Sequence, residues 1–304
     1  MGWNMDKEDL KDIIEKNKDE LFSEIAQEIN NDNVTDIEWD GYNLWITELG
    51  IGSYISGKEL SDRYVENVSI KLANIMGVSF NRSRPILEAN TEKLRISIWH
   101  ESRCGRKSMA IRKIPRKLRF GHGDLVKSDY APESIITLIE NCVTAHLSTV
   151  IGGQPHAGKT ELLKYLATFI PAEEKVGVYE DNQEIHYRKI NPNKKCVEFF
   201  VDDKVTYQDI IKAGLRHNID WILLSESRGP EVAHLLNSLS TGSYCMTTMH
   251  LDEVRDMPDR MYNMLGNSSV NERFINSVYK YIDLVVLVEC DKHEKRRIKQ
   301  IGFL

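Results

Sequence analysis

The spacing of apolar side chains along the first third of the chain alternates between helical and extended patterns. Residues 6–30 predict one amphipathic helix, whose apolar face consists of Leu10, Ile14, Leu21 and Ile25, with Ile13, Phe22 and Ile29 beside it. A second helical pattern covers residues 60–76. Strand candidates are the short apolar runs 35–39, 44–48, 86–89, 94–99 and 108–113. This mixture predicts a small α+β domain over residues 1–118, on which we expect the N-terminal helix to pack.

From residue 133 onward, helical segments and apolar runs alternate. A helix over about 133–145 leads into the apolar strand 148–152, and later strand candidates are 176–179, 197–201, 221–224 and 245–248. Helices lie between most of these strands, which is typical of a doubly wound, mainly parallel sheet. Two further runs, 282–289 and 296–303, predict a closing hairpin. The sequence therefore predicts an α/β domain over residues 133–304.

The segment between these two patterns has a different character. Residues 114–131 are basic, contain Gly121 and Gly123, and lack strong periodicity, so we expect a linker over residues 119–132. A basic linker is usually solvated, and the alternative is that it lines a cleft facing phosphate. A length of 304 residues agrees with two domains, because a domain averages about 150 residues.

Composition narrows the class of protein without naming an activity. A net charge of −6 gives no support to nucleic-acid binding. The five cysteines form no CxxC pair, so neither a zinc site nor a disulfide framework is indicated. The N-terminus lacks the apolar core of a signal peptide, and no apolar run approaches the roughly 18 residues of a membrane span. We therefore expect a cytoplasmic protein that reaches the membrane only through a partner.

The loop after strand 148–152 matches the phosphate-binding pattern G-x-x-x-x-G-K-[ST]. It consists of Gly153, Gln154, Pro155, His156, Ala157, Gly158, Lys159 and Thr160. The glycines let the backbone curl around phosphate oxygens, with N–H groups pointing inward at the positive end of the next helix. Lys159 is expected to reach the β and γ phosphates and Thr160 to bind magnesium, while His156 is expected to be a bystander. We include Glu161, which follows the motif, and expect ATP with Mg²⁺ as the ligand.

Carboxylates follow two of the predicted strands. A P-loop needs carboxylates to hold the water around magnesium and to orient the attacking water. Strand 176–179 leads into Glu180 and Asp181, with Glu184 close behind, and the next apolar strand delivers Glu226. In an open α/β sheet, ligands bind at this end of the strands. We therefore predict a functional Glu226 rather than an ordinary surface residue.

Two further side chains near these strand ends leave alternatives open. Arg228 is suited to clamping a substrate or a neighbouring loop, or else forms a salt bridge to Glu226 or Glu231. His250 ends the strand at 245–248. A histidine in that position is usually structural, but beside a triphosphate it is placed to hydrogen-bond the γ-phosphate.

Taken in order, these segments resemble the secretion traffic ATPases of type II and type IV secretion, type IV and Tad pili, conjugation and archaeal flagella. The resemblance spans about residues 34–304 and points most closely to the type IV secretion and Tad-pilus branch. In the small domain it rests on segments 35–37, 83–85 and 110–113. In the second domain it rests on four boxes, namely the Walker A loop 153–160, the aspartate box 179–184, the Walker B box 225–229 and the histidine box 241–250.

This resemblance implies a RecA-like P-loop NTPase domain, ATP and Mg²⁺ as ligands, and a homo-oligomeric ring, usually a hexamer. It implies that Thr160, Glu180 and Glu226 handle magnesium and water, and that His250 couples the nucleotide state to shape. Arg95 and Arg112 match small-domain arginines that approach the phosphates in the family, and Arg216 matches an arginine just before the Walker B strand; all three are predicted to bind the nucleotide. The implied partner is a membrane protein of a secretion or pilus machine, with the chain at the inner face of the cell membrane.

The chain departs from the family pattern at three points. Ser225 stands where glycine is frequent, Asn218 where a second arginine is common, and Pro155–His156 where small residues are usual. The leading hypothesis is an ATP-hydrolysing motor for a secretion, conjugation or pilus machine. The alternative, motivated by these departures, is a nucleotide-binding ring with little hydrolysis. A small-molecule kinase is a third class, which the histidine box and the fused small domain disfavour.

Overall fold

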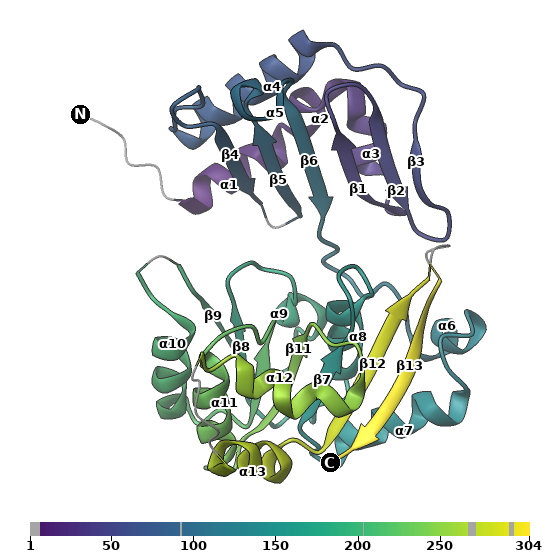
Figure 1. The fold of residues 1–304 in the computed structure, drawn as a ribbon, viewed down its shortest axis with the longest axis vertical. Coiled ribbons are helices and arrows are strands. Elements are labelled where there is room, and N and C mark those ends of the chain that lie inside the picture. The colour runs from purple at the N-terminus through teal and green to yellow at the C-terminus, as the bar shows by residue number, and fades with distance from the viewer. Residues whose placement is uncertain (1–6, 92, 203, 267–271, 292–294) are drawn as a thin grey trace. The chain divides into compact units, whose positions relative to one another are not determined.

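The computed structural model describes residues 7–91, 93–202, 204–266, 272–291 and 295–304. The chain divides into two compact units, one ending at Pro115 and the other beginning at Arg116 and including the C-terminal strand (Figure 1). Each unit has its own apolar core. In the described part of the chain, no helix combines the length and apolar character that a membrane span requires.

The N-terminal unit is built on a six-stranded sheet in the order β3-β2-β1-β6-β5-β4, in which all neighbouring strands are antiparallel. The strands are β1 (Val34–Trp39), β2 (Leu44–Glu48), β3 (Gly52–Ile55), β4 (Ile86–Asn90), β5 (Leu94–Trp99) and β6 (Ser108–Lys113). The helices are α1 (Lys7–Lys16), α2 (Lys18–Leu21), α3 (Ala26–Asn30), α4 (Asp62–Met76) and α5 (Glu101–Cys104), with a 3-10 helix at Ser23–Ile25. Apolar side chains of α4 such as Val65 and Leu72 pack with strand residues such as Ile37 and Ile96, which forms the core.

The predicted single helix over residues 6–30 is wrong in its continuity, because the segment is interrupted at Asn17 and at Phe22. The side-chain amide of Asn17 donates to the Ile13 carbonyl oxygen at 2.8 Å, and side chains of this type compete with regular helical hydrogen bonding. After Phe22 the chain tightens into the 3-10 turn. The apolar face is still buried at Ile14, Phe22 and Ile25. The Leu10 side chain lies outside the described residues.

The C-terminal unit is built on a seven-stranded sheet in the order β13-β12-β7-β11-β10-β8-β9. The strands are β7 (Thr149–Gly152), β8 (Val176–Glu180), β9 (Cys196–Phe200), β10 (Trp221–Leu224), β11 (Tyr244–Met249), β12 (Leu284–Cys290) and β13 (Arg296–Phe303). All neighbouring pairs are parallel except β12 with β13. The predicted mainly parallel α/β domain and its closing hairpin are confirmed.

Helices cover both faces of this sheet. They are α6 (His122–Lys127), α7 (Glu133–Thr144), α8 (Lys159–Ala167), α9 (Tyr187–Ile190), α10 (Tyr207–Gly214), α11 (Glu231–Leu239), α12 (Met257–Asn263) and α13 (Glu272–Tyr281), with 3-10 helices at Leu215–His217 and Val254–Asp256. Alternate strand residues belong to two clusters, so that Ile151 packs with α7 and α8 while Val150 packs with α10, α11 and α13. The strands are therefore apolar on both sides, as parallel strands between two helical layers require.

The segment expected as a linker, 119–132, is part of the C-terminal unit in the structure. It contains α6, and Leu125, Tyr130 and Ala131 are buried in the same cluster as α7 and α8. The carbonyl oxygen of Tyr130 also accepts a hydrogen bond from the Ile298 N–H at 2.9 Å. Burial of these apolar side chains fixes a segment that lacks obvious periodicity.

Candidate functional site

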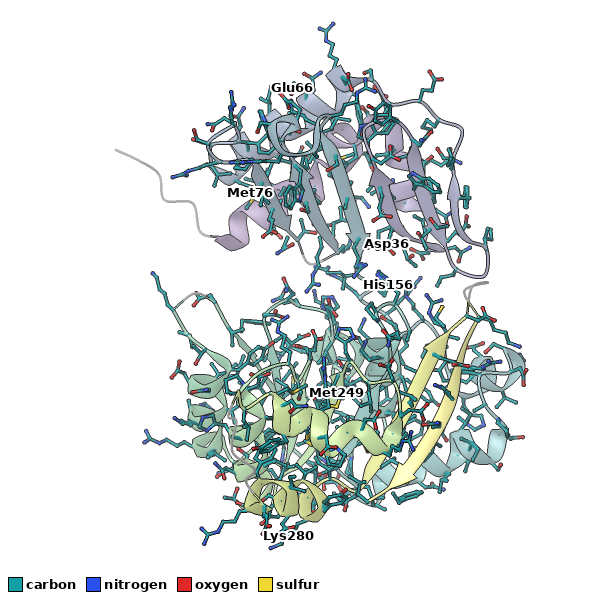
Figure 2. The ribbon with its side chains drawn as sticks, viewed as in Figure 1. Asp36, Glu66, Met76, His156, Met249 and Lys280 are labelled. Carbon is teal, nitrogen blue, oxygen red and sulfur yellow. The ribbon has the colours of Figure 1, made fainter. Side chains whose placement is uncertain are left out.

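The carboxyl ends of the parallel strands bring the candidate residues together within the C-terminal unit. The loop 153–158 joins β7 to α8, and Glu180, Glu226 and His250 lie at or just after the ends of β8, β10 and β11. Since β7 pairs with β11, β11 with β10, and β10 with β8, these ends are neighbours along one edge of the sheet. Figure 2 shows His156 on the loop and Met249 at the end of β11.

Two glycines of the loop are required by its shape. Gly153 has φ 154° and Gly158 has φ 91°, conformations that side chains with a Cβ rarely adopt. A Cβ on Gly153 would lie 2.4 Å from the Val288 carbonyl oxygen of β12, which is far inside van der Waals contact. The loop backbone at Gly153 therefore passes directly against β12. The backbone of the loop is the part that the sequence predicts to surround a ligand.

The Lys159 side chain is folded into the loop. It is 9% exposed, and its Nζ donates to the carbonyl oxygens of Gly153 and Gln154, at 3.0 Å each. Burial lowers the pKa of this ammonium group, while the charges of Glu226 and Glu184 act to raise it. The ammonium group thus lies within the loop for which the sequence predicts phosphate binding.

Contacts from outside the motif hold the loop at two further points. The Gln154 side-chain amide donates to the Asp252 carboxylate, three residues after β11. Arg296 of β13 donates through Nε to the His156 carbonyl oxygen at 3.3 Å. The His156 side chain is exposed and its backbone has φ 63°, so the residue occupies a left-handed turn of the loop. The following Ala157 is fully buried.

Glu180 is buried and closes the turn that follows β8. It is 1% exposed, and its Oε1 accepts the N–H groups of Glu184 and Ile185, at 2.9 Å each. Burial raises the pKa of Glu180 to about 8, although these two hydrogen bonds act to lower it. The turn carries Glu184 to the P-loop, where the Thr160 hydroxyl lies 3.4 Å from Glu184 Oε2. In this arrangement Glu184, rather than Glu180, faces the predicted magnesium ligand.

Glu161 points to positively charged neighbours. Its Oε1 lies 2.8 Å from Lys164 Nζ, and its Oε2 lies 3.9 Å from Arg119 Nε. Lys164 is 1% exposed, so this pair is largely removed from water. Arg119, from the basic segment expected as a linker, therefore contacts the helix that follows the P-loop.

His250 joins the P-loop to the carboxylate after β10. Its Nδ1 lies 3.4 Å from Lys159 Nζ, and its Nε2 lies 3.2 Å from Glu226 Oε1. A lysine ammonium only donates, so Nδ1 accepts and Nε2 carries the proton that it donates to Glu226. The imidazole is thus in contact with the P-loop lysine on one side and with a 30%-exposed carboxylate on the other.

Arg228 continues this chain of contacts. Its guanidinium donates to the Asp181 carboxylate and lies 3.7 Å from Glu226 Oε2. Of the two salt bridges considered from the sequence, the one to Glu226 is present. Glu231 instead accepts the backbone N–H groups of Arg228 and Gly229 at 2.9 and 2.8 Å, which fixes the turn before α11.

The three arginines predicted to bind the nucleotide do not belong to the P-loop or to the strand ends that carry Glu180, Glu226 and His250. Arg95 and Arg112 are directly opposite each other on β5 and β6 of the N-terminal unit, and Arg112 Nε donates to Asp36 Oδ1 at 2.8 Å. Arg216 lies in the 3-10 helix before β10, at the opposite end of that strand from Glu226. It is therefore not at the P-loop of its own chain. The role of all three at a nucleotide stays a prediction.

Sequence reasoning missed three contributors to this region. Arg296 contacts the P-loop from β13, and Asp252 holds Gln154. Arg260, on α12, lines a pocket together with His250. None belongs to a recognised motif, and Arg296 is separated from its contact by 140 positions. Only Asp252 carried a usable signal, since it lies two residues after His250.

The buried Glu180 carboxyl predicts a distinctive dependence of stability on pH. The native state keeps its proton up to about pH 8, whereas an unfolded chain releases it near the ordinary value of 4.5. The native state therefore binds more protons between these values, and the free energy of unfolding should fall by a few kcal/mol as pH rises from about 5 to 8. Above pH 8 this contribution should level off.

Glu180→Gln removes the titration and keeps an oxygen for the two N–H groups. Thermal unfolding at pH 5.5 and 8.5 should show a smaller loss of stability in this variant than in the wild type. Glu173→Gln, at an exposed carboxylate, is the matched control and should follow the wild type. Equal losses for the wild type and Glu180→Gln would contradict the assignment.

Comparison with known proteins identifies a family and several relatives. Residues 84–301 match the family model described as Type II/IV secretion system protein. An uncharacterized protein of Bacillus anthracis is 26% identical over 267 residues, which cover 86% of this chain and 60% of that protein. A putative conjugal transfer protein of Mycobacterium tuberculosis is 28% identical over 174 residues, which cover 55% of this chain and 49% of that protein. The chain thus matches less than two thirds of the length of either relative.

A solved structure shows the same fold. The crystal structure of the VirB11 ATPase from the Brucella suis type IV secretion system, in complex with sulphate, superimposes with a TM-score of 0.51. The alignment has 21% sequence identity and covers 94% of this chain and 97% of that one. This likeness bears on the fold, and the family match covers more than half of the chain, from β4 to β13. The chain belongs to the Type II/IV secretion system protein family.

Proposed function

We propose that this chain binds ATP with Mg²⁺ and hydrolyses it to ADP and phosphate. The observation that carries the proposal is the contact chain from Lys159 through His250 to Glu226. It links the lysine of the P-loop to a partly exposed carboxylate. Phosphoryl transfer to water needs a positive charge that stabilises the phosphate oxygens and a group that orients the attacking water, and these two side chains are suited to supply them.

The P-loop fits a triphosphate. Gly153 and Gly158 adopt the backbone shape of the cradle, α8 begins at Lys159, and the N–H groups at its start suit phosphate oxygens. We propose that Lys159 exchanges its two loop carbonyl contacts for the β and γ phosphates.

Magnesium would be held by oxygen ligands around Thr160. The Thr160 hydroxyl and the Glu184 carboxylate face each other at 3.4 Å, which suits an ion that prefers oxygen and keeps several waters. Glu180 and Glu226 remain the predicted carboxylates for its water shell. When bound, the ion neutralises charge on the β and γ phosphate oxygens.

Glu226 is proposed to accept a proton from the attacking water. Its Oε1 is oriented by His250 Nε2 and its Oε2 lies beside Arg228, so the carboxylate is held from both sides while remaining partly open to solvent. His250 is the proposed sensor, since movement of Lys159 toward a phosphate would change the contact at its Nδ1.

We further propose that the chain works as a homo-oligomeric ring, a hexamer, that drives a secretion, conjugation or pilus machine. The support is the family match and the relatives named for conjugal transfer and type IV secretion. Arg95 and Arg112 are proposed to reach the nucleotide, and Arg216 to contribute from a neighbouring subunit. A membrane protein of the machine is the proposed partner, with the chain at the inner face of the cell membrane.

Two measurements on the purified chain test this function. Phosphate release with magnesium-ATP should exceed release without magnesium, and the mass in solution should correspond to a ring. Tight ATP binding without phosphate release, alone and with a membrane partner, would instead favour a nucleotide-binding ring with little hydrolysis. Absence of ATP binding would overturn both.

A further inference from the structure

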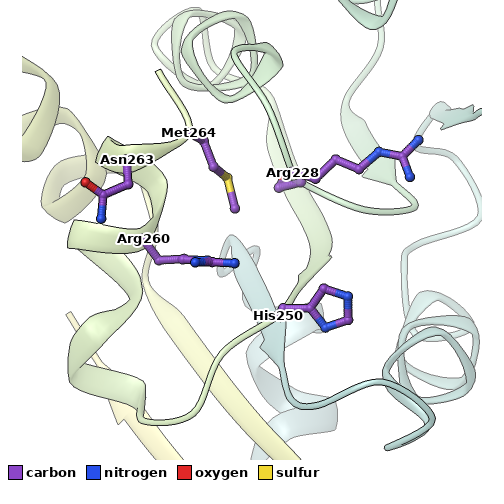
Figure 3. A pocket seen from close by; sticks show the side chains of 6 residues that line it. Arg228, His250, Arg260, Asn263 and Met264 are labelled. Carbon is purple, nitrogen blue, oxygen red and sulfur yellow. The ribbon is translucent and has the colours of Figure 1, made fainter. Parts of the chain in front are cut away.

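A pocket lies beside His250, formed by residues that the P-loop motif does not include. Ser227, Arg228, His250, Arg260, Asn263 and Met264 line it, and its volume is about 200 Å³. In Figure 3, Arg260 extends from α12 toward the pocket that His250 borders, while the Arg228 side chain extends away from Arg260. That direction agrees with the contact between Arg228 and Asp181.

The lining of this pocket is basic and rich in hydrogen-bond donors. The six lining residues include two arginines, a histidine, an asparagine and a serine, but no acidic residue. Since Arg228 is paired with Asp181, Arg260 is the arginine of this set that is available to a ligand. The carboxylates nearest in sequence to Arg228, Glu226 and Glu231, are engaged with His250 and with backbone N–H groups. Within the described part of the chain, no hydrogen bond or ion pair involves the Arg260 guanidinium. A guanidinium without an acid partner, at the wall of a pocket, suits an oxyanion.

The size of the pocket restricts the anion. About 200 Å³ is below the roughly 300–1,000 Å³ of pockets that enclose drug-sized ligands, so the pocket does not enclose a whole nucleotide. A single phosphate with a few waters does. Arg260 and Asn263 are exposed, so the pocket opens to solvent on the α12 side.

The position of the pocket relates it to the proposed reaction. His250 contacts Lys159 through Nδ1 and Glu226 through Nε2, and it also forms part of the pocket wall. His250 therefore belongs to both places, because it contacts Lys159 of the P-loop and is one of the residues that line the pocket. The pocket thus shares a residue with the site where the proposed reaction releases phosphate.

We propose that this pocket binds inorganic phosphate, with Arg260 as its principal ligand, and that it receives the phosphate released by hydrolysis. The second half of this proposal rests on the proposed ATPase function. The first half, phosphate binding that depends on Arg260, does not, and it is measured separately.

The experiment measures binding of radiolabelled phosphate by equilibrium dialysis at constant ionic strength. The full chain is first saturated with magnesium-ADP, which occupies the P-loop. Wild-type protein should bind phosphate in addition to ADP, and Arg260→Met should weaken this binding about tenfold, since a charge-assisted contact is lost. Arg260→Lys should restore part of it, because it keeps the charge without the planar fork.

Arg255→Met is the matched control. Arg255 lies five residues before Arg260, is 85% exposed, and has only a 3.8 Å contact with Asp256. The Arg255→Met variant should bind phosphate with the affinity of the wild type. Equal affinity in wild type and Arg260→Met, or no phosphate binding to the ADP-saturated wild type, overturns the proposal.

A second arm separates this result from the proposed function. The same titration on Lys159→Ala without nucleotide tests the pocket when the cradle has lost its lysine. Phosphate binding that still depends on Arg260 supports the pocket even if ATP turnover is absent. Loss of phosphate binding in Lys159→Ala overturns the pocket as a separate site, even if ADP binding and turnover in the wild type support the ATPase.

Discussion

Lys159→Ala should lower magnesium-dependent ATP turnover by roughly 10²–10³-fold, the cost of removing one preorganised charge-stabilising group from a reaction centre. The reason lies in the position of the ammonium group, which is buried within the loop beside the carbonyl oxygens of Gly153 and Gln154. Phosphate release and ATP affinity should both fall, because the lysine is proposed to contact the phosphates before and during transfer.

The control for this variant is Lys212→Ala, at an exposed lysine of α10. It should retain wild-type turnover. Thermal unfolding of Lys159→Ala should be compared with the wild type, since the removed group also satisfies two carbonyl oxygens. Turnover that stays within a few-fold of wild type in a folded Lys159→Ala protein would refute the proposed use of the loop.

Glu226→Gln should separate binding from hydrolysis. The amide keeps an oxygen that accepts from His250 Nε2, so the contact with the histidine survives while the basic carboxylate is lost. Loss of a group that accepts a proton in the transition state typically costs about 10²–10⁴-fold in rate. We therefore expect turnover to fall by that range while ATP affinity remains within a few-fold of wild type.

Single-turnover measurements with labelled ATP, beside direct binding, distinguish these quantities. Glu173→Gln, at an exposed carboxylate, serves as the control. An equal loss of affinity and rate in Glu226→Gln would show that the residue acts on ligand binding. Unchanged single-turnover rates would assign the role to another carboxylate, for which Glu184 beside Thr160 is the nearest candidate.

The strand ends could be predicted from the sequence because each signal is local. An apolar run of four or five residues followed by glycine or a carboxylate indicates a buried strand and its exit, whatever the rest of the chain does. The P-loop, Glu226 and His250 were placed this way, and parallel pairing brings them to one edge. The contact of Glu226 with His250 is not predicted by these local signals, because it depends on the directions of the two side chains.

Contacts between distant segments could not be predicted. Nothing near Arg296 indicates that it reaches the P-loop, because pairing of β12 with β13 decides its neighbours. The hydrogen bonds of Glu180 are also hidden in the sequence, since a carboxylate after a strand looks the same whether or not it accepts N–H groups of the following turn. The interrupted N-terminal helix is similar, because apolar spacing records which face is buried and not whether the backbone is continuous.

The antiparallel strand β13 has a consequence for shortened forms of the chain. Along its length it covers the edge of β12, whose Val285, Val286 and Val288 are buried, and near its beginning Arg296 supports the P-loop. A chain cut before Arg296 would expose an apolar strand edge, which favours self-association. The same cut would free the loop at His156. Aggregation and weakened nucleotide binding would then both result from the loss of β13. Neither effect would be evidence about the catalytic residues.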